Sequence, residues 1–201
     1  MIKRLLLALA AFLALPALAQ TPVSAPAPKP PVQVLLHTSA GDIVIALEME
    51  KAPISAGNFL HYVETKRLDG QEFYRAMHTA PDAGLIQGGV RDGRKLFPPI
   101  AHEATTRTGL HNVAGAISMA NSGAGTARAD FFILVDDVPG FDADGPGGDA
   151  VGFAAFGHVV EGMDVVKKIW DSPVSQTKGD GPMKGQMLDP TIKIIKASRV
   201  K

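Results

Sequence analysis

The spacing of its apolar runs most limits what this chain can fold into. From residue 32 onward these runs are short and are separated by Gly, Asp and Pro, which is typical of β-strands joined by turns. The first two runs, at residues 32–38 and 43–47, flank a turn at residues 39–42 and predict a hairpin. Within the first run Val34 and Leu36 alternate with their neighbours, as a half-buried strand requires. The chain is therefore expected to be mainly β.

Further strands and two helices follow from the same kind of pattern. One helix is expected to start at Pro53, because proline fits the first helical turn, and the other to run from Met163 to Trp170 and to stop before Pro173. Two helices among many short strands predict a barrel or a sandwich whose openings the helices cover. The other predicted strands are residues 72–75, 85–87, 115–120, 131–135, 154–159 and 191–200, the last with an irregular alternation that suggests a bulge.

The N-terminus has a different pattern. Two basic residues precede a run of almost only Leu, Ala and Phe at residues 5–15, and Ala-Leu-Ala follows at residues 17–19. A basic start, a short apolar centre and an A-x-A end predict a secretory signal peptide at residues 1–19. A transmembrane anchor is the alternative, but this apolar stretch is shorter than the roughly 20 residues that a span needs. We therefore expect a periplasmic or secreted bacterial protein with no membrane attachment after cleavage.

The remaining sequence divides into a linker and one domain. Residues 20–31 are rich in Pro and Ala and have no apolar period, which predicts an extended linker. Residues 32–201 have the length of a single folded domain. The 20 basic and 20 acidic residues give a net charge of zero, so neither nucleic acid nor an anionic membrane is an expected partner. A monomer is expected, because no heptad pattern indicates a helical interface.

Signals for metal, nucleotide or covalent chemistry are missing from the sequence. The chain has no Cys, which excludes disulfides, zinc–thiolate sites, iron–sulfur clusters and a thiol nucleophile. Residues 142–145 (DADG) resemble the start of a calcium loop, but Pro146 and Phe153 stand where further ligands are needed, so a polar turn is predicted. The histidines lack zinc-site spacing, and a hydrolase would lack its nucleophile–base pair. We expect no metal site and no cofactor.

Four stretches of sequence carry most of the functional information. They are Phe73-Tyr74-Arg75 followed by residues 85–89 (LIQGG), then residues 115–121 (GAISMAN), 130–133 (DFFI) and 153–159 (FAAFGHV). In their order and spacing, from about residue 34 to residue 200, they resemble the cyclophilin family of peptidyl-prolyl isomerases, in particular its exported bacterial members. The resemblance implies an eight-stranded antiparallel barrel capped by two α-helices. It also implies a shallow proline-binding groove on the outside of the barrel.

The resemblance assigns roles to individual residues. Arg75 matches the catalytic arginine of the family, Gln87 the glutamine of the groove, and Phe132 the phenylalanine that floors the proline pocket. Taken singly, a surface charge and a core phenylalanine are plainer explanations, and only the shared order of the motifs favours a site. The expected partners are proline-containing polypeptides. The residues implied to line the substrate groove are Leu85, Met119, Ala120, Asn121, Asp130, Phe141 and Phe153.

The chemistry of such a site needs no cofactor. Rotation of a peptide bond has a barrier of ~18–20 kcal/mol because resonance flattens the bond, and it breaks no covalent bond. In the twisted transition state the prolyl nitrogen carries a lone pair, to which the Arg75 guanidinium can donate a hydrogen bond. Because Arg75 stays charged at any working pH, this residue predicts little pH dependence. We expect a peptidyl-prolyl cis-trans isomerase for exported folding proteins; the alternative is a catalytically weak peptide-binding or chaperone module of the same fold.

An insertion near the arginine keeps both alternatives open. Between Arg75 and Gln87 the chain has more residues than the family pattern. Within this segment Gly84 stands where the family usually has a large Phe. Two consequences are compatible with that change: the proline pocket is wider, or Met77 or His78 folds in to fill it.

Three further departures concern the rim of the groove. Asp130 stands where the family often has Gln, and its carboxylate is expected either to orient Arg75 or to sequester it in an ion pair. Gly140 stands at a position that is Trp in members that bind cyclosporin well, so weak cyclosporin binding is expected. Phe153 replaces a His or Tyr and removes a polar contact to the peptide.

Overall fold

The computed structural model describes residues 31–200. The signal peptide expected at residues 1–19 and the linker expected at residues 20–31, except its last residue, lie outside the described part. The first described strand begins at Val32. Between residues 31 and 200, no helix is long and apolar enough to cross a membrane.

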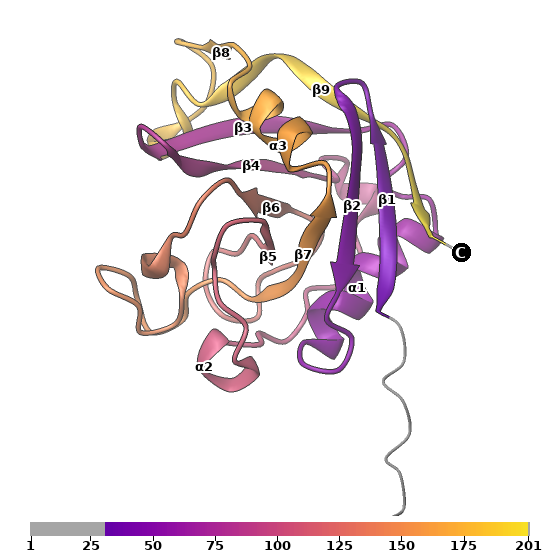
Figure 1. Ribbon diagram of the computed structural model, residues 1–201, viewed down its shortest axis with the longest axis vertical. Coiled ribbons are helices and arrows are strands. Elements are labelled where there is room, and N and C mark those ends of the chain that lie inside the picture. The colour runs from indigo at the N-terminus through magenta and orange to yellow at the C-terminus, as the bar shows by residue number, and fades with distance from the viewer. Residues whose placement is uncertain (1–30, 201) are drawn as a thin grey trace, which may run out of the picture.

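Eight strands form a closed antiparallel barrel, as expected (Figure 1). Around the barrel their order is β1-β2-β7-β5-β6-β4-β3-β9, and β9 returns to pair with β1. A ninth, two-residue strand, β8, pairs with β9 outside this ring. The strands are β1 (Val32–Thr38), β2 (Gly41–Leu47), β3 (Gln71–Ala80), β4 (Ala83–Gly89), β5 (Ala116–Met119), β6 (Phe131–Leu134), β7 (Ala155–Glu161), β8 (Val174–Ser175) and β9 (Met187–Arg199).

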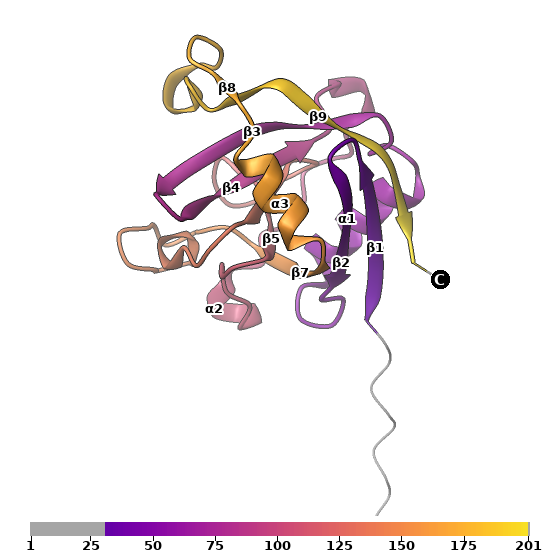
Figure 2. The same cartoon turned by 45° about the horizontal axis from the view of Figure 1, so that its top comes forward.

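Helices close the barrel over an aromatic core. Helix α1 (Pro53–Glu64) packs against β7 and β9 and places Phe59 against the rings of Phe131 and Phe156, at centroid distances of 5.1 and 5.3 Å. Helix α3 (Met163–Trp170) packs against β2, β3 and β4 and lies in front of the barrel in Figure 2. Both helices begin where the sequence predicted. Burial of these large apolar side chains drives the closure.

A distant carboxylate caps the first helix. The residue before α1 is alanine, which offers no side-chain acceptor. Glu103 supplies one instead: its two carboxylate oxygens accept hydrogen bonds from the backbone N–H groups of Ile54 (3.1 Å) and Ser55 (2.7 Å). A negative charge at this end of a helix also complements the helix dipole. Glu103 therefore fixes the loop after β4 to α1.

Two short elements, α2 (Thr105–Thr108) and β8, were not predicted, and two of the expected β segments, the last strand and the β3–β4 hairpin, contain irregularities. Helix α2 is a single turn and β8 has two residues, so neither is long enough to show a period. The bulge expected in the last strand is confirmed at Ile195, because His37 pairs with Lys196 and the next residue of β1 pairs with Ile194. The additional residues before Gly84 extend the β3–β4 hairpin to the pair Ala80–Ala83.

Candidate active site

One row of residues across four strands forms the centre of the site. Arg75 of β3 pairs with Gln87 of β4, Gln87 with Phe132 of β6, and Phe132 with Ser118 of β5. Residues directly opposite each other on neighbouring strands point to the same face of a sheet, so these side chains lie side by side. They point outward, because Phe131, the neighbour of Phe132 in β6, points the other way and fills the barrel core.

A β-bulge turns Arg75 to this outer face. Phe73 pairs with Gly88 and Arg75 pairs with Gln87, so Tyr74 is the extra residue on β3. In a regular strand, residues 73 and 75 would point to the same side. Phe73 instead lies fully buried inside the barrel while Arg75 is outside. The bulge is thus the local feature that brings the guanidinium to the site.

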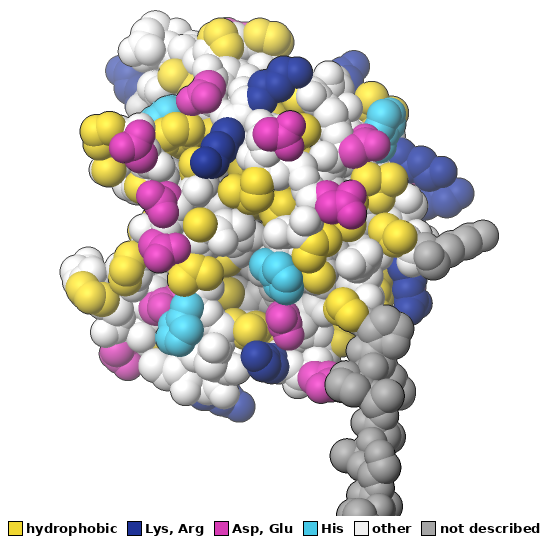
Figure 3. Space-filling model, in the orientation of Figure 1, with side chains coloured by type: hydrophobic (Ala, Val, Ile, Leu, Met, Phe, Trp, Pro, Cys, Tyr) yellow, Lys and Arg dark blue, Asp and Glu magenta, His cyan; other side chains and the backbone are white. Residues whose placement is uncertain are grey.

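An apolar floor lies beside the guanidinium. Phe132 and Leu85 are buried in a cluster on the outside of the barrel, separate from the main core. The Phe132 ring meets the edges of Phe141 and Phe153 at centroid distances of 5.7 and 5.2 Å. The space-filling view shows a notch, lined partly by hydrophobic side chains, between the end of the β3–β4 hairpin and the loop after residue 141 (Figure 3). A small apolar ring fits such a surface by burying area.

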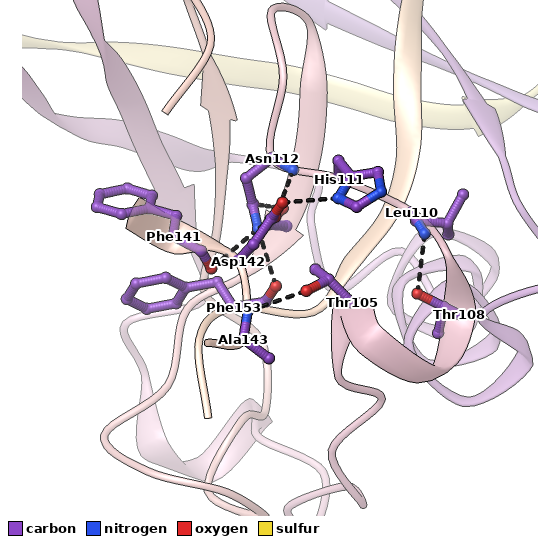
Figure 4. A network of polar contacts seen from close by, with 10 residues as sticks. Thr105, Thr108, Leu110, His111, Asn112, Phe141, Asp142, Ala143 and Phe153 are labelled. Atoms are coloured by element: carbon purple, nitrogen blue, oxygen red, sulfur yellow. Dashed lines mark hydrogen bonds and ion pairs between the residues drawn. The ribbon is translucent and has the colours of Figure 1, made fainter. Parts of the chain in front are cut away.

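Asn112 holds the far wall of this floor in place (Figure 4). Its Nδ2 donates to the backbone oxygens of Phe141 (3.0 Å) and Phe153 (3.1 Å) and to Asp142 Oδ1 (2.8 Å). Burial disfavours the charge on Asp142, but hydrogen bonds from Asn112 and His111 outweigh it and lower the pKa of Asp142. The Gly145 N–H donates to the backbone oxygen of Asp142 (3.0 Å), so residues 142–145 form a polar turn, as predicted. Between residues 31 and 200, no three His, Cys, Asp or Glu side chains gather as a metal site would require.

The Arg75 guanidinium has one N–H left for a substrate. Gln186 Oε1 accepts from Nε (2.8 Å) and from Nη2 (2.6 Å), and Gln87 Oε1 accepts from Nη1 (2.7 Å). The second N–H of Nη2 points to Met77 Sδ (3.0 Å). Of the five N–H donors of arginine, only one, on Nη1, is without a partner among residues 31–200. Burial lowers the pKa of Arg75, but a guanidinium remains charged at any working pH.

A chain of hydrogen bonds continues behind Gln87. Its Nε2 donates to the Tyr74 hydroxyl (2.8 Å), and this hydroxyl donates to Asp130 Oδ2 (3.1 Å). Burial raises the pKa of Asp130 and, with the neighbouring Asp130 charge, also raises the pKa of Tyr74. The guanidinium carbon of Arg91 lies 4.4 Å from the centre of the Tyr74 ring. While Asp130 is ionised, the chain links a charged arginine to a carboxylate through two neutral groups.

A second depression adjoins the other side of Gln87. It is a pocket of about 240 Å³, and its lining includes Gln87, Ala120, Asn121 and Asp130. Asn121 Nδ2 donates to the backbone oxygen of Gly152 (3.1 Å) and so ties the pocket rim to the loop before β7. The floor and this pocket together form an extended surface on both sides of Gln87, suited to a short peptide.

Comparison with known proteins agrees with this geometry. The family described as "Cyclophilin type peptidyl-prolyl cis-trans isomerase/CLD" matches residues 33–198. The chain belongs to this family. As a cyclophilin it has the enzyme class that the sequence predicted. Peptidyl-prolyl cis-trans isomerase A of Dickeya dadantii (strain 3937) is 39% identical over 172 residues, 81% of this chain and 84% of the relative. Peptidyl-prolyl cis-trans isomerase B of Escherichia coli (strain K12) is 38% identical over 141 residues, 68% of this chain and 82% of the relative.

Solved structures agree with the cyclophilin fold. A cyclophilin type peptidyl-prolyl cis-trans isomerase of Cryptosporidium parvum superposes with a TM-score of 0.67 at 19% identity, over 85% of this chain and 98% of that chain. A structure of the same protein in the presence of the dipeptide Ala-Pro gives a TM-score of 0.66 at 18% identity, over 84% and 99% of the two chains. At such low identity these likenesses concern the fold alone.

Most of the expected site residues are neighbours in this cyclophilin, and one is not. Arg75, Gln87 and Phe132 form the central row. Met119 was expected in the groove, but this is wrong: it is buried in the barrel core. Ser118 faces outward in the central row, so strand alternation turns Met119 inward. The others lie around the floor or the pocket: Leu85, Ala120, Asn121, Asp130, Phe141 and Phe153.

Two expectations about the departures from the family pattern are also resolved. Asp130 neither orients Arg75 directly nor sequesters it, because its carboxylate accepts from Tyr74 instead. Met77, not His78, packs against the floor. The His78 ring stacks on Trp170 at a centroid distance of 3.9 Å and is thereby held away from the floor.

Sequence reasoning missed three residues that support the site. Gln186 and Asn112 lie in loops, where no period marks them. Tyr74 stands beside the expected arginine, and a signal for its bulge was present. The motif places an apolar Phe73 two positions before the site residue Arg75, and a regular strand would turn both to the same face, so a core position for Phe73 requires a bulge between them.

Proposed function

We propose that this protein accelerates cis–trans rotation at X–Pro bonds by a non-covalent mechanism in which Arg75 stabilises the twisted transition state. The observation that carries the proposal is the remaining N–H of Arg75 Nη1, beside an apolar floor. The floor of Phe132 and Leu85 suits the apolar proline ring, and the guanidinium suits its nitrogen. No side chain of the site has to break a covalent bond.

Arg75 acts by binding the transition state more tightly than the ground state. In a planar peptide the prolyl nitrogen shares its electron pair with the carbonyl and accepts hydrogen bonds poorly. When the bond twists, the nitrogen regains a lone pair, and the N–H of Arg75 donates to it. Gln87 and Gln186 hold the guanidinium before the substrate arrives, so little reorganisation accompanies the reaction.

The proposed setting of this activity is outside the cytoplasm, in the periplasm or beyond. The basic and apolar start of the chain and its A-x-A sequence support export. Uncatalysed X–Pro exchange takes tens of seconds and limits folding, so exported proteins with proline are fitting substrates. Their recognition as extended polypeptides agrees with the length of the groove and the adjoining pocket.

Exchange of a short Ala-Pro peptide, followed by NMR, tests this function. We expect the wild-type protein to speed exchange and Arg75→Ala to reduce the catalysed rate by about 10²–10³-fold, the usual cost of removing one donor to developing charge. Arg94→Ala is the matched control, since the Arg94 side chain is 90% exposed and pairs with Asp92 on the surface. Equal rates for wild type and Arg75→Ala, with both folded, would refute the role of Arg75.

Titration of the protein with the same peptide, also followed by NMR, distinguishes the second candidate, a catalytically weak binding or chaperone module. The observation that favours it is the apolar character of the groove rim, where Gly140 and Phe153 offer no polar side-chain contact to a peptide. Chemical-shift changes that saturate with peptide, without faster exchange, would select this module.

A further inference from the structure

The hydrogen-bond chain behind the site has only one possible direction while Asp130 is ionised. At one end the guanidinium of Arg75 can only donate, and at the other the carboxylate of Asp130 can only accept. Between them Gln87 must turn its oxygen to Arg75 and its NH₂ to Tyr74. The Tyr74 hydroxyl must then accept from Gln87 and donate to Asp130. Each member fixes the orientation of the next.

Asp130 is built into this position rather than resting on the surface. Its Oδ1 is buried without a hydrogen-bond partner among residues 31–200, and its Oδ2 accepts from Tyr74. The space for Oδ1 exists because residue 89 is glycine: a Cβ there would come within 2.3 Å of it. A half-satisfied buried carboxylate is costly, so its retention beside the site calls for a role.

We propose that Tyr74 and Asp130 are positioning residues of the isomerase: by holding the NH₂ of Gln87, they keep the Gln87 oxygen on Arg75 and so aim the free N–H of Nη1. This inference rests on the proposed function of Arg75. It explains why Tyr74 is the bulge residue, since the bulge places its hydroxyl behind Gln87 on the same side as Arg75. Neither residue donates to the substrate itself.

Protonation of Asp130 would reverse this direction. A protonated Asp130 carboxyl can donate a hydrogen bond to the Tyr74 hydroxyl, which then donates its own proton to Gln87. This favours a flipped Gln87 amide, with its oxygen facing Tyr74 and its NH₂ facing the guanidinium. The titratable groups that face Asp130 are Tyr74, which hydrogen-bonds to it, Arg91, whose positive charge favours its ionised form, and Tyr62 of α1, whose pKa the Asp130 charge helps to raise. Burial outweighs the Tyr74 hydrogen bond and the Arg91 charge and raises the pKa of Asp130, so reversal begins at a higher pH than for an exposed Asp.

A pair of tyrosine variants tests the positioning role. Tyr74→Phe removes the hydroxyl between Gln87 and Asp130. Tyr62→Phe removes the hydroxyl of another buried tyrosine, on α1, which accepts from the Phe97 N–H (2.7 Å) and is not a member of the chain from Arg75 to Asp130. We expect Tyr74→Phe to lower the exchange rate of saturated enzyme about tenfold and to change the peptide Kd less than about twofold, because the aim of Arg75 matters in the transition state. Tyr62→Phe should keep both values.

The pH profile supplies the second readout. The wild-type rate should fall on acidification with a single ionisation, and Asp130→Asn should be slower and flat over the same range, with peptide Kd unchanged. The inference would be overturned if Tyr74→Phe kept the wild-type exchange rate, if Tyr62→Phe lost as much rate as Tyr74→Phe, or if Tyr74→Phe weakened only peptide binding. It would also be overturned if the rate of Asp130→Asn still fell on acidification. If Arg75→Ala abolishes exchange while Tyr74→Phe keeps it, the proposed function stands and this inference alone fails.

Discussion

Glycine at position 84 makes the altered hairpin compatible with the barrel. Gly84 pairs with His78 of β3, and the Trp170 indole Nε1 donates to the backbone oxygen of the preceding residue, Met77 (2.9 Å). A Cβ on residue 84 would lie 1.9 Å from that oxygen and 2.5 Å from Nε1. The large Phe of the family pattern is therefore excluded here. Met77 meanwhile turns to the apolar floor and to Arg75, so the altered segment still contributes to the site.

Replacement of this glycine should destabilise the protein. Gly84→Ala forces the β3–β4 pair and the indole apart, and we expect a loss of about 1–3 kcal/mol in the free energy of unfolding, measured in urea. Gly57→Ala is the matched control, because a Cβ at Gly57 of α1 meets nothing within 4 Å. That change should stabilise the protein by about 0.5–1 kcal/mol, since alanine favours helices. Equal stability of Gly84→Ala and wild type would contradict the packing argument.

At the scale of elements, periodic segments were predictable and irregular ones were not. The hairpin of β1 and β2, helix α1 and helix α3 are long enough to show their period. β1, α1 and α3 start where expected, whereas β2 starts at Gly41, before the expected Ile43. Helix α2 has no such period, and its N-terminal Thr105 matters through a tertiary contact: its hydroxyl accepts from the Ala143 N–H (2.9 Å) beneath the groove wall. Contacts of this kind depend on the folded barrel and leave no local pattern.

The cap on α1 is a second tertiary feature and gives a stability prediction. Removing the Glu103 carboxylate leaves the N–H groups of Ile54 and Ser55 without their acceptor, so Glu103→Ala should cost about 1–3 kcal/mol in the free energy of unfolding. Glu103→Gln keeps one acceptor oxygen and should cost less. Glu50→Ala, at an exposed position, is the control and should be within about 0.5 kcal/mol of wild type. If the backbone N–H of Ser55 exchanges faster in Glu103→Ala but not in Glu50→Ala, the loss of stability arises at the cap of α1. Unchanged exchange at Ser55 would argue against the cap.

At the scale of the molecule, the site combines a rigid barrel face with three loops. The row of Arg75, Gln87 and Phe132 was predictable, because motif order identified the residues and strand pairing aligns them. Gln186 and Asn112 come from loops on opposite sides of that row. Their positions follow from chain closure around the whole barrel, which sequence patterns do not encode. The loops therefore set the shape of the rim, and ligands that depend on the rim should discriminate this protein from its relatives.

Cyclosporin is such a ligand, and we expect it to bind weakly. Members of the family that bind it well have a Trp at the position of Gly140, and an indole supplies both a large contact area and an N–H donor. Here a Cβ on residue 140 would lie 2.9 Å from the Pro146 backbone oxygen, so the rim is occupied by main chain instead. Titration calorimetry should give a Kd in the micromolar range or weaker, about 4 kcal/mol less favourable than nanomolar binding. The Ala-Pro peptide serves as the control, because it needs only the floor and Arg75 and should still be isomerised. Nanomolar cyclosporin binding would show that main chain and Phe141 replace the indole, and the rim would then not be the source of selectivity.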